Sequence, residues 1–317
     1  MTRRDRVKAA LAHQPADRPP YFIHLCDDAW QALGERRGGM DVETFLGNDV
    51  RGVGIPWWNW FELAPDWSGF DPPTSPAKVK GCGSYPALEE DLKRLADSSD
   101  QYVLAMVYGS HFEKAYFARG IENCLADMAG SPDFARRFLA RIVDKNMVML
   151  ENVLSLPGID GVLLGSDWGT QLDLLMSPAV WDDMIRPGEQ REYDLIHAYG
   201  KDVWIHSCGK IDKLIPRLVE MGVDVLNPVQ PECMDIASLV RRHGPDITFW
   251  GGISTQRVLP FGTPDEVRAD ARRTRAVLGA HNGYILAPSQ SIQSDVPPEN
   301  LMALLDVARE TPPPAAR

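Results

Sequence analysis

The chain has no excess of positive charge, and this excludes the usual electrostatic basis for nucleic-acid binding. Its 317 residues carry 33 Lys and Arg against 44 Asp and Glu, a formal net charge of −11. Such a surface repels a phosphate backbone, so we expect no nucleic-acid partner. No apolar run reaches membrane-spanning length, so we also expect no membrane association. The basic start, residues 1–6, leads into an amphipathic segment and not into a signal-peptide core.

Cysteine is scarce, and several common motifs are missing. The five cysteines are odd in number and widely scattered: Cys26, Cys82, Cys124, Cys208 and Cys233. This pattern is not a disulfide framework, and it favours a protein of the reducing cytoplasm. The sequence contains no Gly-x-Gly-x-x-Gly opening a helix after a strand and no Walker-type loop. It also lacks a nucleophile elbow and a Ser-His-Asp signature, which argues against a serine hydrolase.

Short apolar runs are present instead, and they alternate with helical segments. They occupy residues 18–25, 50–55, 103–108, 161–167, 203–206, 223–227, 247–251 and 284–287. Most are apolar throughout, which is typical of parallel strands covered on both faces. Ser131, Ser177 and Thr263 each precede a proline, so they are expected to cap helices, and Thr263 with Glu266 fits a capping box.

About eight strand–helix units in a chain of this length predict one (β/α)8 TIM-barrel domain over residues 1–317. A doubly wound open sheet is the alternative. Residues 56–87, which are rich in Pro, Gly and Trp, are expected to form an irregular excursion from the barrel.

The pair His206 and Cys208 is the strongest functional signal. Both follow the apolar run 203–206, and side chains two positions apart on a strand point the same way. Nitrogen and sulfur together form a zinc-type ligand pair. The structural alternative is a strand-end histidine beside a buried free cysteine. Asp167 ends another apolar run, where an unpaired polar group is costly. His111 follows Gly109-Ser110 and is interpreted as a residue that caps a helix.

Several motifs together resemble one known family. They are Arg-Arg-Asp-Arg-Val-Lys-Ala-Ala-Leu-Ala-His at residues 3–13, Asp-Arg-Pro-Pro at 17–20, Gly-Ser-Asp-Trp-Gly-Thr-Gln at 165–171, His-Ser-Cys-Gly-Lys at 206–210, Gly-Val-Asp-Val-Leu-Asn-Pro-Val-Gln at 222–230 and Gly-Tyr-Ile-Leu-Ala-Pro at 283–288. Across nearly its whole length the chain resembles uroporphyrinogen decarboxylase-like proteins. This resemblance implies a (β/α)8 barrel.

Within that family the chain resembles the methyltransferase branch more than the true decarboxylases. The decarboxylases have an arginine-rich segment that pairs with substrate carboxylates, whereas residues 21–28 contain no arginine and include Asp27 and Asp28. The methyltransferase branch implies a zinc ion on His206 and Cys208, with Asp167 and His206 as catalytic residues. It implies methyl transfer between a small methylated substrate, or a corrinoid carrier protein, and a thiol or tetrahydrofolate.

The branch commonly has a third cysteine where this chain has Gln290, so the next zinc ligand is open between two candidates. Cys26 ends the first apolar run with the same His-x-Cys spacing, and the first and last strands of a closed barrel are neighbours. Asp167 is the other candidate, through an oxygen.

A further set of residues is expected to contact substrate: His24, Asp27, Trp57, Trp58, Trp60, Gln230 and Gln290. The tryptophans can stack on an aromatic methyl ether or hold a methylated ammonium. Their alternative role is a packed lid or a homodimer interface. Two other functions stay open: a metal-free decarboxylase or lyase with His206 and Asp167 as its acid/base pair, and a non-catalytic ligand-binding homologue.

Overall fold

The computed structural model describes residues 1–57, 83–107 and 109–311, so the predicted substrate residues Trp58 and Trp60 lie outside it. The chain divides into two compact units. The first unit comprises Met1–Arg51, Asp100–Tyr102 and Asp224–Arg317, and the second comprises Gly52–Ser99 and Val103–Val223. The strands β1 (Val50–Gly54) and β2 (Tyr102–Val107) each begin in the first unit and continue into the second.

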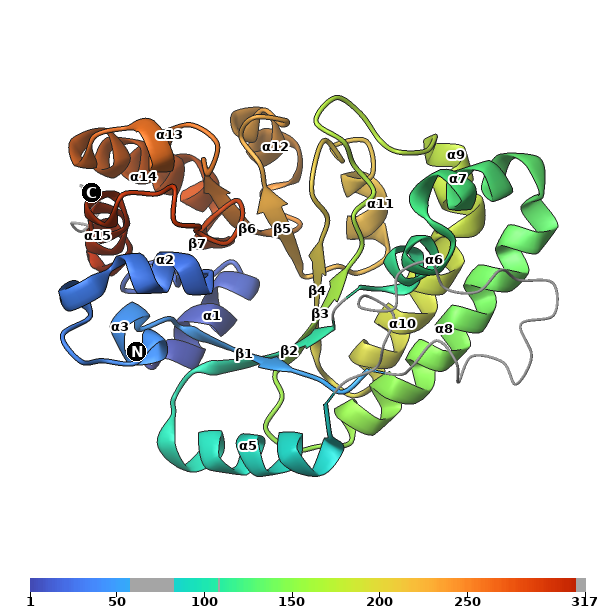
Figure 1. Cartoon of the computed structure of the whole chain (residues 1–317), viewed down its shortest axis with the longest axis horizontal. Coiled ribbons are helices and arrows are strands. Elements are labelled where there is room, and N and C mark those ends of the chain that lie inside the picture. The colour runs from blue at the N-terminus through green and yellow to red at the C-terminus, as the bar shows by residue number, and fades with distance from the viewer. Residues whose placement is uncertain (58–82, 108, 312–317) are drawn as a thin grey trace. The chain divides into compact units, whose positions relative to one another are not determined.

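The second unit is built around parallel strands that lie in chain order. Strand β2 pairs with β3 (Gly161–Gly165), and β3 pairs with β4 (Asp202–His206), with Gly165 opposite His206. The helices of this unit are α5 (Tyr85–Ser98), α6 (His111–Arg119), α7 (Ile121–Gly130), α8 (Pro132–Leu154), α9 (Pro178–Met184), α10 (Arg186–Ala198) and α11 (Ile215–Glu220). The long α8 lies beside α10 (Figure 1).

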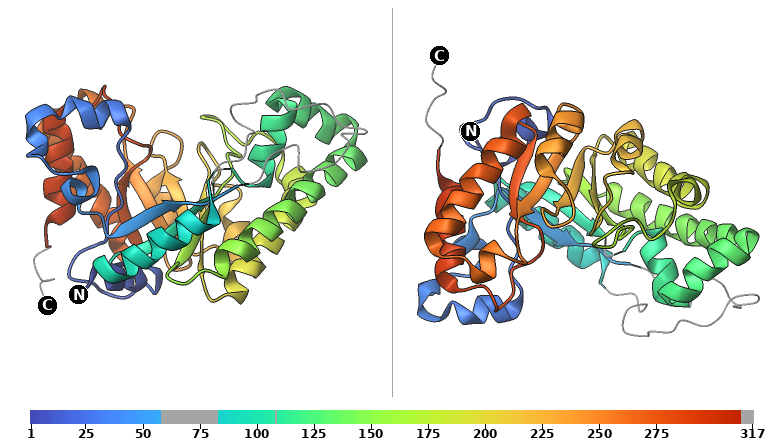
Figure 2. Two further views of the ribbon diagram at one scale, coloured as in Figure 1. Left: turned by 60° about the horizontal axis from the view of Figure 1, so that its bottom comes forward. Right: turned by 90° about the horizontal axis from the view of Figure 1, so that it is seen from above.

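The first unit contains three more parallel strands. Strand β6 (Thr248–Ile253) pairs with β5 (Val225–Val229) on one side and with β7 (Tyr284–Pro288) on the other. Every residue of these strands is buried, as their apolar sequences predict. The helices of this unit are α1 (Arg3–Leu11), α2 (Asp27–Ala32), η1 (Gly34–Arg37), α3 (Val42–Leu46), α12 (Ile236–His243), α13 (Val258–Phe261), α14 (Pro264–Leu278), η3 (Gly279–His281) and α15 (Pro298–Arg309). Helices α14 and α15 lie side by side (Figure 2).

The predicted first strand, residues 18–25, is the one apolar run that is not a regular strand. It forms only isolated parallel bridges, Tyr21 to Leu286 and Leu25 to Ile292. On its other side, the Asp49 amide donates to the Tyr21 carbonyl at 3.0 Å, but at Ile23 a side chain replaces the partner backbone. Asn48 accepts from the Ile23 amide at 2.9 Å and donates to the Ile23 carbonyl at 3.0 Å. The segment therefore lies beside β7 in extended form, where a closing barrel strand is expected, without a continuous ladder.

Two of the three predicted helix caps are confirmed. The Thr263 hydroxyl accepts from the Glu266 amide at the start of α14, and the Glu266 carboxylate returns to the Thr263 amide, which completes the capping box. Ser177 accepts from the amide of Val180 at the start of α9. Ser131 stands at the cap position of α8, but its hydroxyl makes no capping bond. The predicted cap position of Ser131 is therefore confirmed but its hydroxyl cap is not, and its backbone has a ψ of 57°, away from the extended conformation of the other two caps.

Candidate active site at the ends of strands β3 and β4

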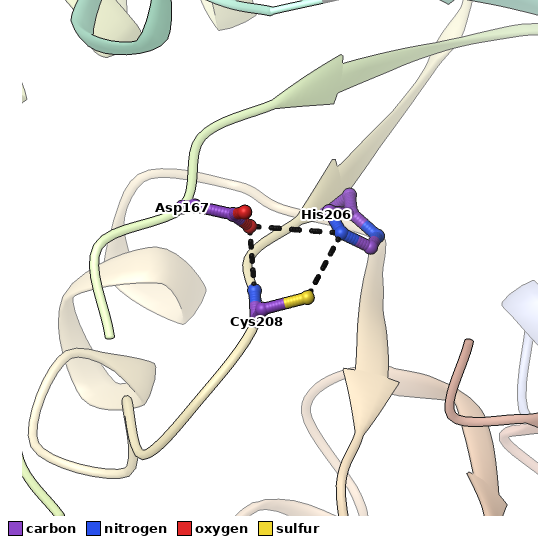
Figure 3. A group of neighbouring side chains, drawn as sticks. All are labelled: Asp167, His206 and Cys208. Carbon is purple, nitrogen blue, oxygen red and sulfur yellow. Dashed lines mark hydrogen bonds and ion pairs between the residues drawn. The ribbon is translucent and has the colours of Figure 1, made fainter. Parts of the chain in front are cut away.

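Three polar side chains meet just beyond the carboxyl ends of two neighbouring strands. The Nε2 atom of His206 lies 3.3 Å from the Cys208 Sγ and 3.6 Å from the Asp167 Oδ1 (Figure 3). Asp167 follows β3, whereas His206 ends β4 and Cys208 follows it. All three side chains are half-buried. The structure thus brings together both catalytic candidates and two of the three metal-ligand candidates.

Hydrogen bonds between the two loops hold this arrangement. The Asp167 Oδ1 accepts the backbone amide of Cys208 at 2.8 Å, which orients the carboxylate toward the histidine. The amide of Ser166 donates to the His206 carbonyl at 2.8 Å, and the amide of Trp168 donates to the Ser207 hydroxyl at 3.0 Å. The parallel register of β3 and β4 therefore continues into the loops and fixes the Asp167 side chain against the His-x-Cys segment.

Two glycines let the loops approach this closely. Gly209 has a φ of +84°, and a Cβ on it would lie 2.6 Å from the Gly169 carbonyl carbon and from the Thr170 carbonyl oxygen. A Cβ on Gly169 would in turn lie 2.6 Å from the carbonyl oxygen of Cys208. Any larger residue at either position would force the two loops apart. The glycines are thus part of what places Asp167 beside Cys208.

The donor set fits a zinc ion in both chemistry and spacing. Imidazole nitrogen, thiolate sulfur and carboxylate oxygen are the three ligand types of protein zinc sites. Bond lengths of 2.0–2.3 Å in a tetrahedron place neighbouring ligand atoms roughly 3.3 to 3.7 Å apart. The separations of 3.3 Å and 3.6 Å around His206 Nε2 match this range, and all three ligand atoms lie within 4.8 Å of one another.

The carboxyl group of Glu113 adds a titratable neighbour. Burial raises its pKa to about 7, and the negative charge of Asp167 adds to the rise. The Tyr116 hydroxyl donates to the Glu113 Oε1 at 3.1 Å and works in the opposite direction. Sequence reasoning missed Glu113, because a glutamate in the first turn of a helix is ordinary there.

Of the tryptophan candidates, only Trp57 falls in the described part of the chain. The Nζ atom of Lys114 lies 5.8 Å from the centre of its ring, within range of a cation–π contact. Lys114 is fully buried, and this burial lowers its pKa to about 8. Trp57 therefore has a cationic neighbour within the protein itself.

The first unit holds the remaining candidates, two of them on the extended first segment. The His24 ring packs edge-on against Phe22, with centroids 4.2 Å apart, and against Trp250 at 6.1 Å. Cys26 is the cap residue of α2, and its amide donates to the Ile292 carbonyl at 2.8 Å. Burial raises the pKa of the Cys26 thiol, and the charges of Asp28 and Asp27 raise it further.

The other three candidates of the first unit differ in exposure. Asp27 is exposed in the first turn of α2. Gln230 is buried directly after β5, and its carbonyl accepts the amides of Cys233 and Met234. Gln290 is exposed after β7 and lines a cavity of about 210 Å³. Gln230 and Gln290 thus follow strands, whereas Asp27 begins a helix.

A second polar cluster lies fully buried in the second unit, and sequence reasoning missed most of it. It joins the start of α6 to the inner face of α10 through four fully buried residues: Ser110, His111, Glu189 and Glu192. The interpretation of His111 as a mere cap was wrong. Ser110 is the cap of α6, while the His111 ring faces Glu189 and Glu192 at 3.5 Å and 3.7 Å.

One signal in the sequence could have revealed this cluster. Glu189 and Glu192 share a helical face with Tyr193 and Ile196, which is the buried face of α10. Two carboxylates on the apolar face of an amphipathic helix are unusual, because a buried charge needs a partner. Only the folded chain shows that the partners come from α6 and from Ser166 after β3.

Parallel strands that alternate with helices, with polar side chains gathered at strand ends, define the class of α/β-barrel proteins. The comparison with solved structures agrees. A methyltransferase from Methanosarcina mazei superposes with a TM-score of 0.71 at 16% identity, over 97% of this chain and 98% of that one. At this identity the likeness shows the shared barrel fold. Among the described residues, no helix is long and apolar enough to cross a membrane.

Residues 68–311 match the family model of uroporphyrinogen decarboxylase (URO-D), and the chain belongs to this family. The expected family is therefore confirmed. A curated relative, the uroporphyrinogen decarboxylase of Azoarcus sp. (strain BH72), is 24% identical over 188 residues. That match covers 56% of this chain and 48% of the relative, so the chain spans about half the length of the curated protein it matches.

Proposed function

We propose that the protein is a zinc-assisted methyltransferase with its metal on His206 and Cys208. The observation that supports this most directly is the convergence of nitrogen, sulfur and oxygen donors around the His206 Nε2 atom, at 3.3 Å and 3.6 Å. A structural histidine beside a buried thiol does not require a carboxylate at the same point. A metal site requires a further ligand there, and a carboxylate can supply it, because zinc in proteins takes three or four protein ligands.

Each side chain has a distinct role in this proposal. His206 binds through Nε2 and Cys208 through its thiolate. When bound, zinc makes a thiol acceptor nucleophilic at neutral pH or polarises a methyl donor as a Lewis acid. Asp167 is oriented by the Cys208 amide and either completes the ligand set or holds the substrate. Cys26 is the alternative third ligand, and Gln230 with Gln290 is proposed to orient the substrate.

The substrates follow from the same proposal. A small methylated compound or a corrinoid carrier protein supplies the methyl group, and a thiol or tetrahydrofolate accepts it. His24, Asp27 and the tryptophans at positions 57, 58 and 60 are proposed to contact the methylated substrate. Acidic and aromatic side chains together favour a methylated cation over an anion. The structural neighbour named a methyltransferase agrees with this reaction class.

Metal analysis combined with a transfer assay tests the proposal. We expect about one zinc per chain in protein that has never met a chelator. His206→Ala and Cys208→Ser should lose the zinc together with methyl transfer to homocysteine or cobalamin. Cys233→Ser is the matched control, because it removes another half-buried thiol and should keep the metal. Asp167→Asn and Cys26→Ser, compared in the same assay, identify the third ligand. A metal-free wild type, or full zinc in His206→Ala, would refute the proposal.

A metal-free decarboxylase is the second candidate, and one contact favours it. The His206 Nε2 and Asp167 Oδ1 atoms lie 3.6 Å apart, a spacing from which an acid/base pair can form. The curated relative carries that activity in its name. Release of carbon dioxide from a porphyrinogen, undiminished by chelator, would support this candidate over the methyltransferase.

A further inference from the structure

The buried cluster on α6 and α10 contains four ligand-type atoms in a compact group. The Ser110 Oγ lies 2.9 Å from the Glu189 Oε1, and 3.3 Å from both the Glu192 Oε2 and the His111 Nδ1. The His111 Nδ1 lies 3.5 Å from the Glu189 Oε1 and 3.7 Å from the Glu192 Oε2. One oxygen of each carboxylate and a ring nitrogen of His111 all lie within 4.8 Å of one another. The four side chains therefore meet at one place in the interior of the second unit.

The Ser110 hydroxyl hydrogen-bonds to Glu189 at 2.9 Å, but the two histidine–carboxylate separations are longer than direct hydrogen bonds and correspond to ligands around a shared cation. Bonds of 2.0–2.2 Å to nitrogen and oxygen place tetrahedral ligands roughly 3.3 to 3.6 Å apart. A histidine bound directly to a carboxylate would come within about 2.7 to 2.9 Å. The His111 ring faces two carboxylates and stays beyond that distance from both.

The second oxygen of Glu189 makes no hydrogen bond of ordinary geometry. The Glu189 Oε2 is buried and lacks such a bond among the described residues, while the Tyr193 hydroxyl on the same face of α10 interacts with this carboxyl group and opposes the rise of its pKa. Glu189 and Tyr193 are both completely buried. A buried oxygen without a well-formed hydrogen bond costs about 1–3 kcal/mol, more when it is charged. Rotation of the Glu189 carboxylate onto an ion would use both of its oxygens.

We propose that Ser110, His111, Glu189 and Glu192 form a second, structural site for a small divalent cation, separate from the His206 site. Three oxygens and one imidazole nitrogen suit Mn²⁺ or Zn²⁺. The two glutamates supply negative charge to the ion in competition with the buried ammonium of Lys114, and the imidazole binds in its neutral form. Asn146 donates to the Glu192 Oε1 at 2.7 Å and so orients that ligand, as a supporting residue does around bound metals.

The site has a structural consequence for the loop that carries Asp167. The Ser166 hydroxyl donates to the Glu189 Oε1 at 2.9 Å, and Ser166 directly precedes Asp167. A bound ion would connect the start of α6 to the buried face of α10, and through Ser166 it would also hold the loop after β3. Its role is therefore to hold the β3 loop in place, with no direct part in the chemistry.

The decisive protein is the double variant His206→Ala/Cys208→Ser, because it removes the proposed zinc ligands and leaves the buried cluster intact. After loading with Mn²⁺ or Zn²⁺ and dialysis, we expect about one ion per chain. Adding Glu192→Gln should abolish it, since the amide keeps an oxygen for Asn146 but loses the charge. Glu122→Gln, an exposed glutamate of α7, is the control and should retain the ion.

Folding of each variant is checked by far-ultraviolet circular dichroism, and anomalous diffraction at the metal edge locates the ion. A peak bounded by Ser110 and His111 is the expected result. No retained ion with either metal in the folded double variant, retention by Glu192→Gln, or a peak elsewhere would overturn the proposal. The outcome is independent of the proposed function, because zinc at His206 is measured by the difference between wild type and double variant.

Discussion

Glu113 offers the sharpest quantitative test of the electrostatics around the candidate site. Its Oε2 lies 2.6 Å from where a Cβ on Gly165 would stand, so the carboxyl group is packed against the end of β3. Burial raises its pKa from an ordinary 4.5 to about 7, with Asp167 adding to the rise. The folded protein therefore holds a proton on Glu113 at pH values where the unfolded chain has released it.

The difference between the folded and unfolded pKa values of Glu113 sets the direction and the size of the change in stability with pH. Stability from the protonated group is fully present below pH 4.5 and is lost as the pH rises to about 7. At about 1.36 kcal/mol per pKa unit, the stabilisation that has been lost once the pH exceeds 7 amounts to about 3 kcal/mol in total. Glu113→Gln is neutral at every pH, and its carbonyl oxygen can still accept from the Tyr116 hydroxyl. The variant should escape the loss.

Urea unfolding at pH 5 and pH 7.5 measures this directly. We expect Glu113→Gln to exceed wild type by about 1 kcal/mol at pH 5 and by about 3 kcal/mol at pH 7.5. Glu122→Gln, which lies exposed on α7, should follow wild type at both pH values. A stability difference between Glu113→Gln and wild type that does not change with pH would refute the reasoning.

Three further substitutions test other parts of the structure. Gly209→Ala combines a positive φ of +84° with a Cβ 2.6 Å from two backbone atoms. It should lower the unfolding free energy by about 1–3 kcal/mol and reduce zinc retention, and unchanged metal content would contradict the loop packing. Asp49→Ala leaves Arg6 and Arg18 without their buried partner at 3.2 Å and 2.7 Å. The unfolding free energy measured in guanidinium should fall by about 3–5 kcal/mol. A loss below 1 kcal/mol would show that the ion pairs of Asp49 with the two arginines are not shielded from water. Thr263→Ala removes the capping box of α14 and should lower the unfolding free energy by about 1 kcal/mol in the same assay. No change would mean that the capping hydrogen bonds do not stabilise the folded protein.

The strands were the most predictable part of the fold, because burial on both faces requires apolar residues throughout. The runs around β3, β4 and β7 match the observed strands to within two residues at either end. The exception is residues 18–25, whose apolar pattern is also that of a strand. Their ladder is broken because the side chains of Asn48 and Asp49 take the hydrogen bonds that a neighbouring backbone would use. The sequence of residues 18–25 does not indicate that these side chains will take the place of a neighbouring strand.

The candidate site was partly predictable for a similar reason. His206 and Cys208 are two positions apart on one segment, so their proximity follows from local geometry alone. Asp167 was a candidate only as a polar end to an apolar run. That it faces His206 depends on the parallel register, with Gly165 opposite His206, and on the close contact of Gly169 with Gly209.

The amino-acid sequence by itself determined the class of fold, the family and the His-x-Cys pair, because periodicity, helix caps and local spacing act over a few residues. Only the tertiary structure decided which side chain joins that pair and that His111 meets Glu189 and Glu192. Those contacts join residues far apart in the chain, 41 positions between Asp167 and Cys208 and 79 between Ser110 and Glu189. They exist because strand pairing and helix packing bring those segments together, and around His111, Glu189 and Glu192 the packing also excludes water.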